Sequence, residues 1–350
     1  MYLKNMANML SIVAIFYIIG KLDFTVMHPG TVLVNRTDNA TFHKYKESQN
    51  GFTWTHGMTR RSNVVSISAV GTREKDQKLL CNKYRILATG SSSGFGSGLK
   101  QDETWSAYLN SSESSSIYNY VIYNSSNPGW GPYHWANYMQ AYYDIFNPDL
   151  MLVMLSYGDF TLYPKVVSES DREEWLKRDR IKKRILNFDN FGAYSLRKLM
   201  YITENFAGKY ETNKVSGNPI PLGFDMLRIA KHLGNHMGSL EDLVDYSERK
   251  KANLIFFLRK SDETDAGNYL FNEIGKLTEL SEYASAVQVN ADSFRSDMGS
   301  KELSEYYQEH FVLKNDTHPN ERYSRLIADV LSSELPLVLN ELEIKNNCDF

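Results

Sequence analysis

Apolar residues in this chain gather in short runs that are separated by glycine, proline and charged residues. Five of the runs have the length and composition expected of strands. They lie at residues 84–89, 118–123, 149–155, 253–258 and 286–289. The run at 149–155 is almost unbroken, which is typical of a strand buried on both faces.

Between these runs the apolar residues recur at helical spacing. The pattern predicts helices at residues 103–109, 133–145, 224–249 and 319–333. Strands that alternate with helices imply a parallel sheet covered on both sides. The predicted fold class is therefore α/β, a three-layer α/β/α sandwich of about five strands. In such sheets active sites lie beyond the carboxyl ends of the strands.

Changes in composition divide the chain into four parts. Residues 1–21 form an apolar leader, and residues 22–80 have the mixed periodicity of a short-stranded lead-in packed on the core. Residues 81–335 form the main domain, with a charged helical insertion around residues 160–215. The remainder, 336–350, is a C-terminal tail.

The leader has the charge pattern of an export signal. Lys4 and Lys21 flank a run of about 15 mostly apolar residues, as in a signal peptide or a short signal anchor. No small-x-small cleavage site follows, which favours an uncleaved anchor, and a buried N-terminal helix is the alternative. We expect an exported protein, secreted or membrane-anchored in an extracellular or periplasmic space, that contacts the membrane through this segment only.

Composition excludes several classes of function. A net charge of −3 lacks the basic footprint of a nucleic-acid partner. Only two cysteines occur, Cys81 and Cys348, too few for a disulfide framework or a metal cluster, and their pairing stays undecided. His232 and His236 have the i,i+4 spacing of metal ligands, but no third ligand is apparent nearby, so we expect no metal.

A glycine- and serine-rich segment follows the first predicted strand. Gly90-Ser-Ser-Ser-Gly94 matches G-x-S-x-G, the pattern of a nucleophile on a sharp strand-to-helix turn. Such a turn needs glycines, and it presents one hydroxyl, here that of Ser92, beside backbone N–H groups that favour an oxyanion. An ordinary loop is the alternative reading of this segment alone.

A second candidate element precedes the last predicted helix. His318 follows Asp316 closely, so the histidine can act as a base while the carboxylate holds its tautomer. The alternative is structural, because Asp316 or Thr317 can cap the helix.

Further segments place these two elements in a known order. Residues 70–73 (Val-Gly-Thr-Arg) precede the serine segment, and residues 124–131, 149–160 and 316–320 follow it. In this order the segments resemble the motif blocks of the SGNH, or GDSL-type, esterases over residues 70–333. The resemblance implies a flavodoxin-like sheet with strand order 2-1-3-4-5. It also implies a reaction that needs no metal or organic cofactor.

The resemblance also assigns roles to particular residues. Ser92 would be the nucleophile, His318 its base, and Asp316 the acid that orients the base. The backbone N–H groups of Ser92 and Ser126 would bind the oxyanion. Candidate substrate contacts are Asn127, Trp130, Tyr133 and Asp159.

Three departures from the family pattern concern the site, and the first is that the glycine whose backbone N–H usually donates to the oxyanion falls on Ser126. The asparagine that usually donates to the oxyanion falls on Gly158 or Phe160, and neither has an amide side chain; Asn124 or Asn127 is a candidate replacement. The aspartate usually three residues before the histidine is Asn315 here, so Asp316 takes that role.

The expected function is hydrolysis of acyl esters, with O-acetyl esters on a carbohydrate or lipid as the leading substrate. Aromatic residues make up 13% of the chain, which favours a sugar-contacting surface. The alternatives are a non-catalytic SGNH-like glycan-binding or assembly protein and an O-acyltransferase with the same triad. The α/β-hydrolase fold is the structural alternative, disfavoured because Ser92 follows the first core strand.

Overall fold

The computed structural model describes most of the predicted core. The described ranges are 35–38, 40–52, 63–74, 79–156, 159–160, 222–258, 265–289 and 318–342, apart from residues 46 and 81, together with scattered positions between 11 and 18 and between 170 and 177. Asp316, Gly158 and both cysteines lie outside the described residues. So do most of the predicted leader and most of the predicted insertion.

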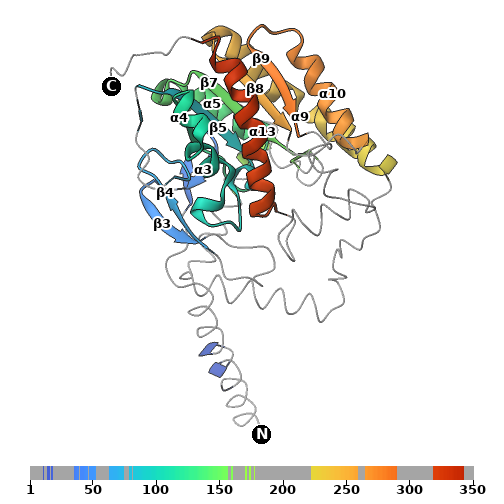
Figure 1. Ribbon diagram of the computed structural model, residues 1–350. Helices are drawn as coiled ribbons and strands as arrows, with labels where there is room; N and C mark the ends of the chain where they lie inside the picture. The colour runs from blue at the N-terminus through green and yellow to red at the C-terminus, as the bar shows by residue number, and fades with distance from the viewer. Residues whose placement is uncertain are drawn as a thin grey trace, which may run out of the picture.

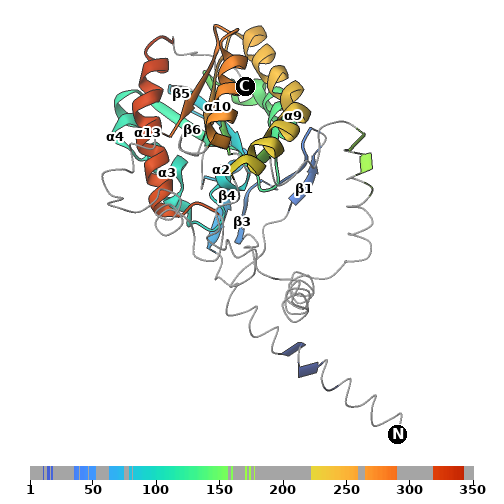
Figure 2. The same cartoon turned by 90° about the vertical axis from the view of Figure 1, so that its right-hand side faces the viewer.

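Five parallel strands form the central sheet, in the order β6-β5-β7-β8-β9. Figure 1 labels β5, β7, β8 and β9, and Figure 2 labels β6. They are β5 (Tyr84–Gly90), β6 (Tyr120–Asn124), β7 (Leu150–Leu155), β8 (Asn253–Leu258) and β9 (Ala284–Gln288). Numbered along the chain, the order is 2-1-3-4-5, so the expected topology is confirmed. Every residue of the central strand β7 is buried, as its continuous apolar run predicts.

Three helices cover one face of the sheet. They are α5 (Pro132–Phe146), α9 (Leu222–Lys250) and α10 (Asp265–Thr278). Their apolar sides pack on Leu87 and its alternating neighbours along the strands.

The opposite face is covered by α3 (Trp105–Asn110) and α13 (Glu321–Leu339). These helices pack on Ile86, Leu152 and the residues in register with them. Figure 2 shows α13 and α9 on opposite sides of the strands. The expected three-layer α/β/α sandwich is confirmed.

Residues of the predicted lead-in form two small antiparallel sheets. One pairs β1 (Asn35–Asp38) with β2 (Phe42–Tyr45), and the other pairs β3 (Gln49–Phe52) with β4 (Val64–Ile67). Side chains from β2 and β4 form a small apolar cluster with Phe95 of the main domain. The lead-in therefore packs directly against the segment that carries Ser92.

Helix α13 differs from the prediction at both ends. Its N-cap is Asn320, whose side chain accepts the N–H of Tyr323, rather than Asp316 or Thr317. The helix also continues to Leu339, through Pro336. Proline cannot donate to the carbonyl four residues before it. Here that carbonyl, of Ser332, accepts a hydrogen bond of 3.3 Å from Ser114 Oγ instead.

No helix among the described residues is long and apolar enough to cross a membrane. Only scattered positions of the apolar run at 6–20 are among the described residues. The predicted anchor therefore stays a prediction.

A buried ion pair joins the amino ends of β5 and β7. Asp149 Oδ2 accepts the backbone N–H of Arg85 at 2.8 Å and lies 4.0 Å from the guanidinium Nε. Both side chains are almost fully buried. Removing one partner of such a pair leaves the other charge buried and uncompensated, which destabilises the folded state.

We predict that D149A lowers the free energy of unfolding by about 3–5 kcal/mol, because the buried Arg85 guanidinium loses its carboxylate. The matched control is E273A, which breaks the solvent-exposed Lys276–Glu273 pair on α10 and should change stability little. Urea denaturation of both variants measures the difference. Equal effects of the two substitutions would contradict this account of the pair.

Candidate active site

The chain turns sharply where β5 ends, and Ser92 lies at that turn. Gly90 is the last residue of β5, Ser91 is extended, and the short helix α2 (Ser92–Phe95) begins at once. The N–H groups of a first helical turn have no acceptor within the helix, so they are available to an anion. Ser92 is half-buried at the carboxyl edge of the sheet, as a nucleophile on this turn should be.

Two glycines are required here by the side chain of Ser126. A Cβ atom at Gly94 would lie 2.8 Å from Ser126 Oγ, and one at Gly90 would lie 3.3 Å from the same atom and 3.0 Å from the Met154 carbonyl oxygen. Ser126 Oγ is buried and has no hydrogen-bond partner among the described residues. Because Gly90 and Gly94 have no Cβ atom, the loop after β6 can pack closely against α2.

The side chains of His318 and Ser92 are in direct contact. Its Nε2 atom lies 2.8 Å from Ser92 Oγ, although the two residues are 226 positions apart in the chain. That distance is within hydrogen-bond reach, which a general base for the serine hydroxyl requires. The pairing of Ser92 with His318 suggested by the sequence is thus present as a direct contact.

Hydrogen bonds to Glu321 hold the start of α13, close to His318 in the chain. The hydroxyl of Tyr108, on α3, donates to Glu321 Oε1 at 2.9 Å, and Arg325 donates to the same oxygen at 2.8 Å. Burial, followed by this contact with Glu321, raises the pKa of Tyr108 to about 12, so the hydroxyl remains a donor at neutral pH. These bonds join α13 to α3 and so set the position of His318.

Asn124, at the end of β6, links the serine turn to the loop that holds Ser126. Its Nδ2 donates to the carbonyl oxygen of Gly94 at 2.9 Å, and its Oδ1 accepts the N–H of Ser126 at 3.1 Å. Trp105 Nε1 donates to the same Gly94 carbonyl at 2.7 Å. Asn124 is fully buried, so it acts here as a structural tie between the two loops.

The other candidate residues between positions 127 and 134 are mostly buried. Asn127 and Trp130 are only 3% exposed, whereas Tyr133 is half-buried. Trp130 packs on Tyr138 with ring centroids 5.2 Å apart, so it belongs to the core. His134 lies in the first turn of α5, where its Nδ1 accepts the N–H of Gly131.

Asp159 caps the segment after β7. Its Oδ2 accepts the backbone N–H of Ser156 at 2.8 Å and the Ser156 hydroxyl at 3.1 Å. This geometry supports a capping role for Asp159, and its predicted contact with the substrate stays a prediction. The proposed acid Asp316 lies outside the described residues, so its role stays a prediction.

The described residues contain no group of three or more histidine, cysteine, aspartate or glutamate side chains that could hold a metal ion. His236 is buried and packs edge-on against Phe160, with ring centroids 5.9 Å apart. The side chain of His232 is not among those described.

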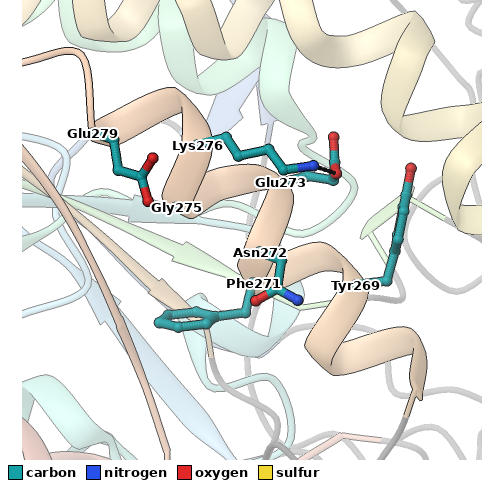
Figure 3. Close-up of a pocket in the computed structure, with 7 residues that line it drawn as sticks. All are labelled: Tyr269, Phe271, Asn272, Glu273, Gly275, Lys276 and Glu279. Carbon is teal, nitrogen blue, oxygen red and sulfur yellow. Dashed lines mark hydrogen bonds and ion pairs between the residues drawn. The ribbon is translucent and has the colours of Figure 1, made fainter.

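A separate hollow of about 510 Å³ lies on the surface at α10 (Figure 3). Its lining comes from α10 and the turn that follows, including Tyr269 and the exposed Lys276–Glu273 ion pair. None of the candidate catalytic residues lines it, so this hollow is distinct from the site at Ser92.

Comparison with known proteins gives structural matches only. No family model matches the chain, and no curated protein matches it by sequence. A structure described as a lipolytic protein of the G-D-S-L family from Desulfitobacterium hafniense DCB-2 matches at 11% identity and a TM-score of 0.40, covering 72% of this chain and 99% of the other. The psychrotrophic esterase EstA from Pseudoalteromonas sp. matches at 14% identity and a TM-score of 0.41, covering 74% and 100%.

A carbohydrate esterase of family 3 from Talaromyces cellulolyticus matches at 10% identity and a TM-score of 0.38, covering 74% of this chain and 100% of the other. The solved structures that match thus include proteins of the kind that the motif blocks resemble. At these identities and TM-scores the matches carry no argument about activity, which must come from the geometry of the chain itself.

Sequence reasoning missed how Asn124 and Trp105 hold the turn, and it gave Arg73 no role beyond a motif position. All three are buried, and their polar groups bond to backbone carbonyls near Ser92. Their positions, a strand end, a helix start and a turn in the lead-in, give no local sign of these contacts. Only the fold brings them together.

Glu74 is a half-buried residue whose carboxyl group lies beside this network, with its Oε1 atom out of contact with solvent. Burial raises its pKa to about 7, opposed by a hydrogen bond with Ser106 and by the charge of Arg73. Its Oε1 atom has no hydrogen-bond partner among the described residues. A carboxyl group with a raised pKa holds its proton more tightly in the folded state than in the unfolded state.

The contribution of Glu74 to the free energy of unfolding should therefore fall as pH rises from about 4.5 to about 7. In that window the folded state binds more protons than the unfolded state does. We predict that E74Q, which stays neutral, gains stability relative to wild type between pH 5 and pH 8. Chemical denaturation of both proteins at the two pH values measures this gain. A difference between them that does not change with pH would contradict the assignment.

Proposed function

We propose that the chain is a serine esterase that works through an acyl-enzyme intermediate. The observation that carries the proposal is the 2.8 Å contact between Ser92 Oγ and His318 Nε2 at a strand-to-helix turn. A hydroxyl hydrogen-bonded to an imidazole can lose its proton as it attacks a carbonyl carbon.

In the proposed cycle His318 takes the proton of Ser92 and returns it to the leaving alcohol. A water molecule, activated by the same imidazole, then releases the acid from Ser92. Asp316, two residues before His318, is the proposed acid that orients the ring. No metal or organic cofactor is required by these steps.

The proposed oxyanion site consists of the backbone N–H groups of Ser92 and Ser126. The N–H of Ser126 points to Asn124 Oδ1 at 3.1 Å in this structure, so an oxyanion would share this donor or replace that bond. Position 158 is a glycine and supplies no side-chain amide. Loss of one donor costs on the order of 10²–10³ in rate in a known protease. A site with fewer donors suits esters, whose alcohol leaves more easily than an amine.

For the substrate we favour an acylated carbohydrate or lipid, with an acetyl group as the acyl part. The aromatic composition and the predicted export support this choice of substrate class. Because Trp130 is buried, Tyr133 is the better candidate for stacking on a sugar ring. Export and membrane attachment through residues 1–21 remain part of the proposal.

A second candidate is a non-catalytic glycan-binding protein with the same fold. The missing amide at position 158, together with the engaged N–H of Ser126, favours it. An O-acyltransferase would share the triad and differ in the acceptor of the acyl group.

The proposal predicts that a fluorophosphonate probe labels Ser92 and that p-nitrophenyl acetate is hydrolysed. S92A should abolish labelling and turnover, and H318A should lower kcat by about 10²–10⁴, the contribution of a general base. The matched control is S93A, which removes the next hydroxyl of α2 and should keep both.

Each other outcome points to one of the alternatives. Absence of any Ser92-dependent labelling and turnover favours the binding protein and contradicts the esterase. Acyl transfer to an added alcohol or sugar in preference to water identifies a transferase.

A further inference from the structure

Arg73 is a buried arginine whose guanidinium lies at the carboxyl end of α2, opposite the end that carries Ser92. The residue is 1% exposed, and its guanidinium donates to four backbone carbonyls between residues 95 and 100. Nη1 donates to the carbonyl oxygens of Phe95 and Gly96, and Nη2 donates to that of Leu99 at 2.7 Å. A second contact of Nη2, with the Lys100 carbonyl, is longer at 3.4 Å.

The end of α2 is shaped to receive this group. Gly96 ends the helix with φ +74°, a conformation that glycine adopts without strain. A Cβ atom at Gly96 would lie 2.8 Å from Arg73 Nη1, so a side chain there would displace the guanidinium. The guanidinium also lies over the ring of Phe95, with Cζ 4.5 Å from the ring centroid.

The main chain of Arg73 contacts the end of β6, which leads into the loop that holds Ser126. Its N–H donates to the carbonyl oxygen of Asn124 at 2.9 Å. The side chain of Asn124 in turn bonds to Gly94 of α2 and to the N–H of Ser126. One residue thus touches both the helix that bears Ser92 and the strand end that leads to Ser126.

The charge of Arg73 persists at neutral pH. Burial lowers the pKa of Arg73 to about 10, opposed chiefly by the charge of Glu74 and then by Tyr45 and Glu103. Hydrogen bonds from a charged donor are shorter and stronger than neutral ones. A planar guanidinium can serve several carbonyls at once, which a lysine ammonium in the same place cannot reproduce.

We propose that Arg73 is a positioning residue for the reaction. It does not contact the substrate; it holds α2 and the Ser126 loop in the one arrangement that aligns Ser92 with His318 and with the oxyanion donors. The inference rests on the proposed function for its catalytic consequence, but the holding of α2 is a property of the folded chain and is measurable without substrate.

The test compares R73K with R85K in the full chain. Arg85 is an equally buried arginine on β5. It lies near the amino end of that strand, whereas Ser92 follows the carboxyl end. Both variants should have a lower Tm, since each alters a buried charged group. Only R73K should lower kcat for p-nitrophenyl acetate, by about 10–10² with KM little changed, as expected when reacting groups are misplaced.

Hydrogen–deuterium exchange supplies a readout that is independent of activity. Peptides covering residues 91–100 should exchange faster in R73K than in wild type or R85K, measured well below each variant's Tm. Q101A is the milder variant, because Gln101 Nε2 donates to the carbonyl oxygen of Arg73 and its loss loosens the same residue. It should change kcat and exchange in the same direction as R73K, by less.

The outcomes separate the two proposals. If wild type shows no Ser92-dependent turnover, the esterase proposal fails, and exchange in residues 91–100 still decides whether Arg73 holds α2. If R73K and Q101A exchange like R85K in these peptides, or if kcat falls equally in R73K and R85K, the positioning role is overturned.

Discussion

The hydrogen bond between Ser92 and His318 depends on almost every part of the fold. Ser92 is placed by β5 and the turn into α2, whereas His318 is placed by the start of α13. The two meet because α13 packs on the same sheet face as α3, and Tyr108 of α3 bonds to Glu321 beside His318. A contact between residues so far apart in sequence requires that both sheet and helices have formed.

Around this contact several buried side chains donate to the backbone carbonyl oxygens of α2 and of the residues after it. The Gly94 carbonyl accepts from Trp105 and Asn124, and the carbonyls beyond it accept from Arg73. Buried donors of this kind are costly to leave unsatisfied, so each fixes the backbone that it contacts. These bonds support the backbone of α2, since a helix of one turn has little stability of its own.

Much of the fold can be predicted from sequence because the buried strands are nearly continuous in apolar residues. The apolar run at 253–258 predicts a strand with the observed bounds, and the predicted bounds of β5 and β7 differ by one residue at an end. Helix α10 was missed because glycine and asparagine lower its helix propensity. Its buried residues Leu270 and Ile274 are one turn apart, so the helical spacing of its inner face is nevertheless visible in the sequence. The site is predictable where a motif carries it, at Ser92 and His318, whereas the interior contacts of Arg73 and Asn124 depend on tertiary structure.

The most direct measurement is a crystal structure of the protein after reaction with a fluorophosphonate. The account predicts phosphorus bonded to Ser92 Oγ, with the phosphonyl oxygen within hydrogen-bond distance of the N–H groups of Ser92 and Ser126 and with His318 still adjacent. An adduct on another residue, or a phosphonyl oxygen turned away from both N–H groups, would contradict it. So would a Ser92 that stays unmodified under conditions where an authentic serine esterase reacts fully.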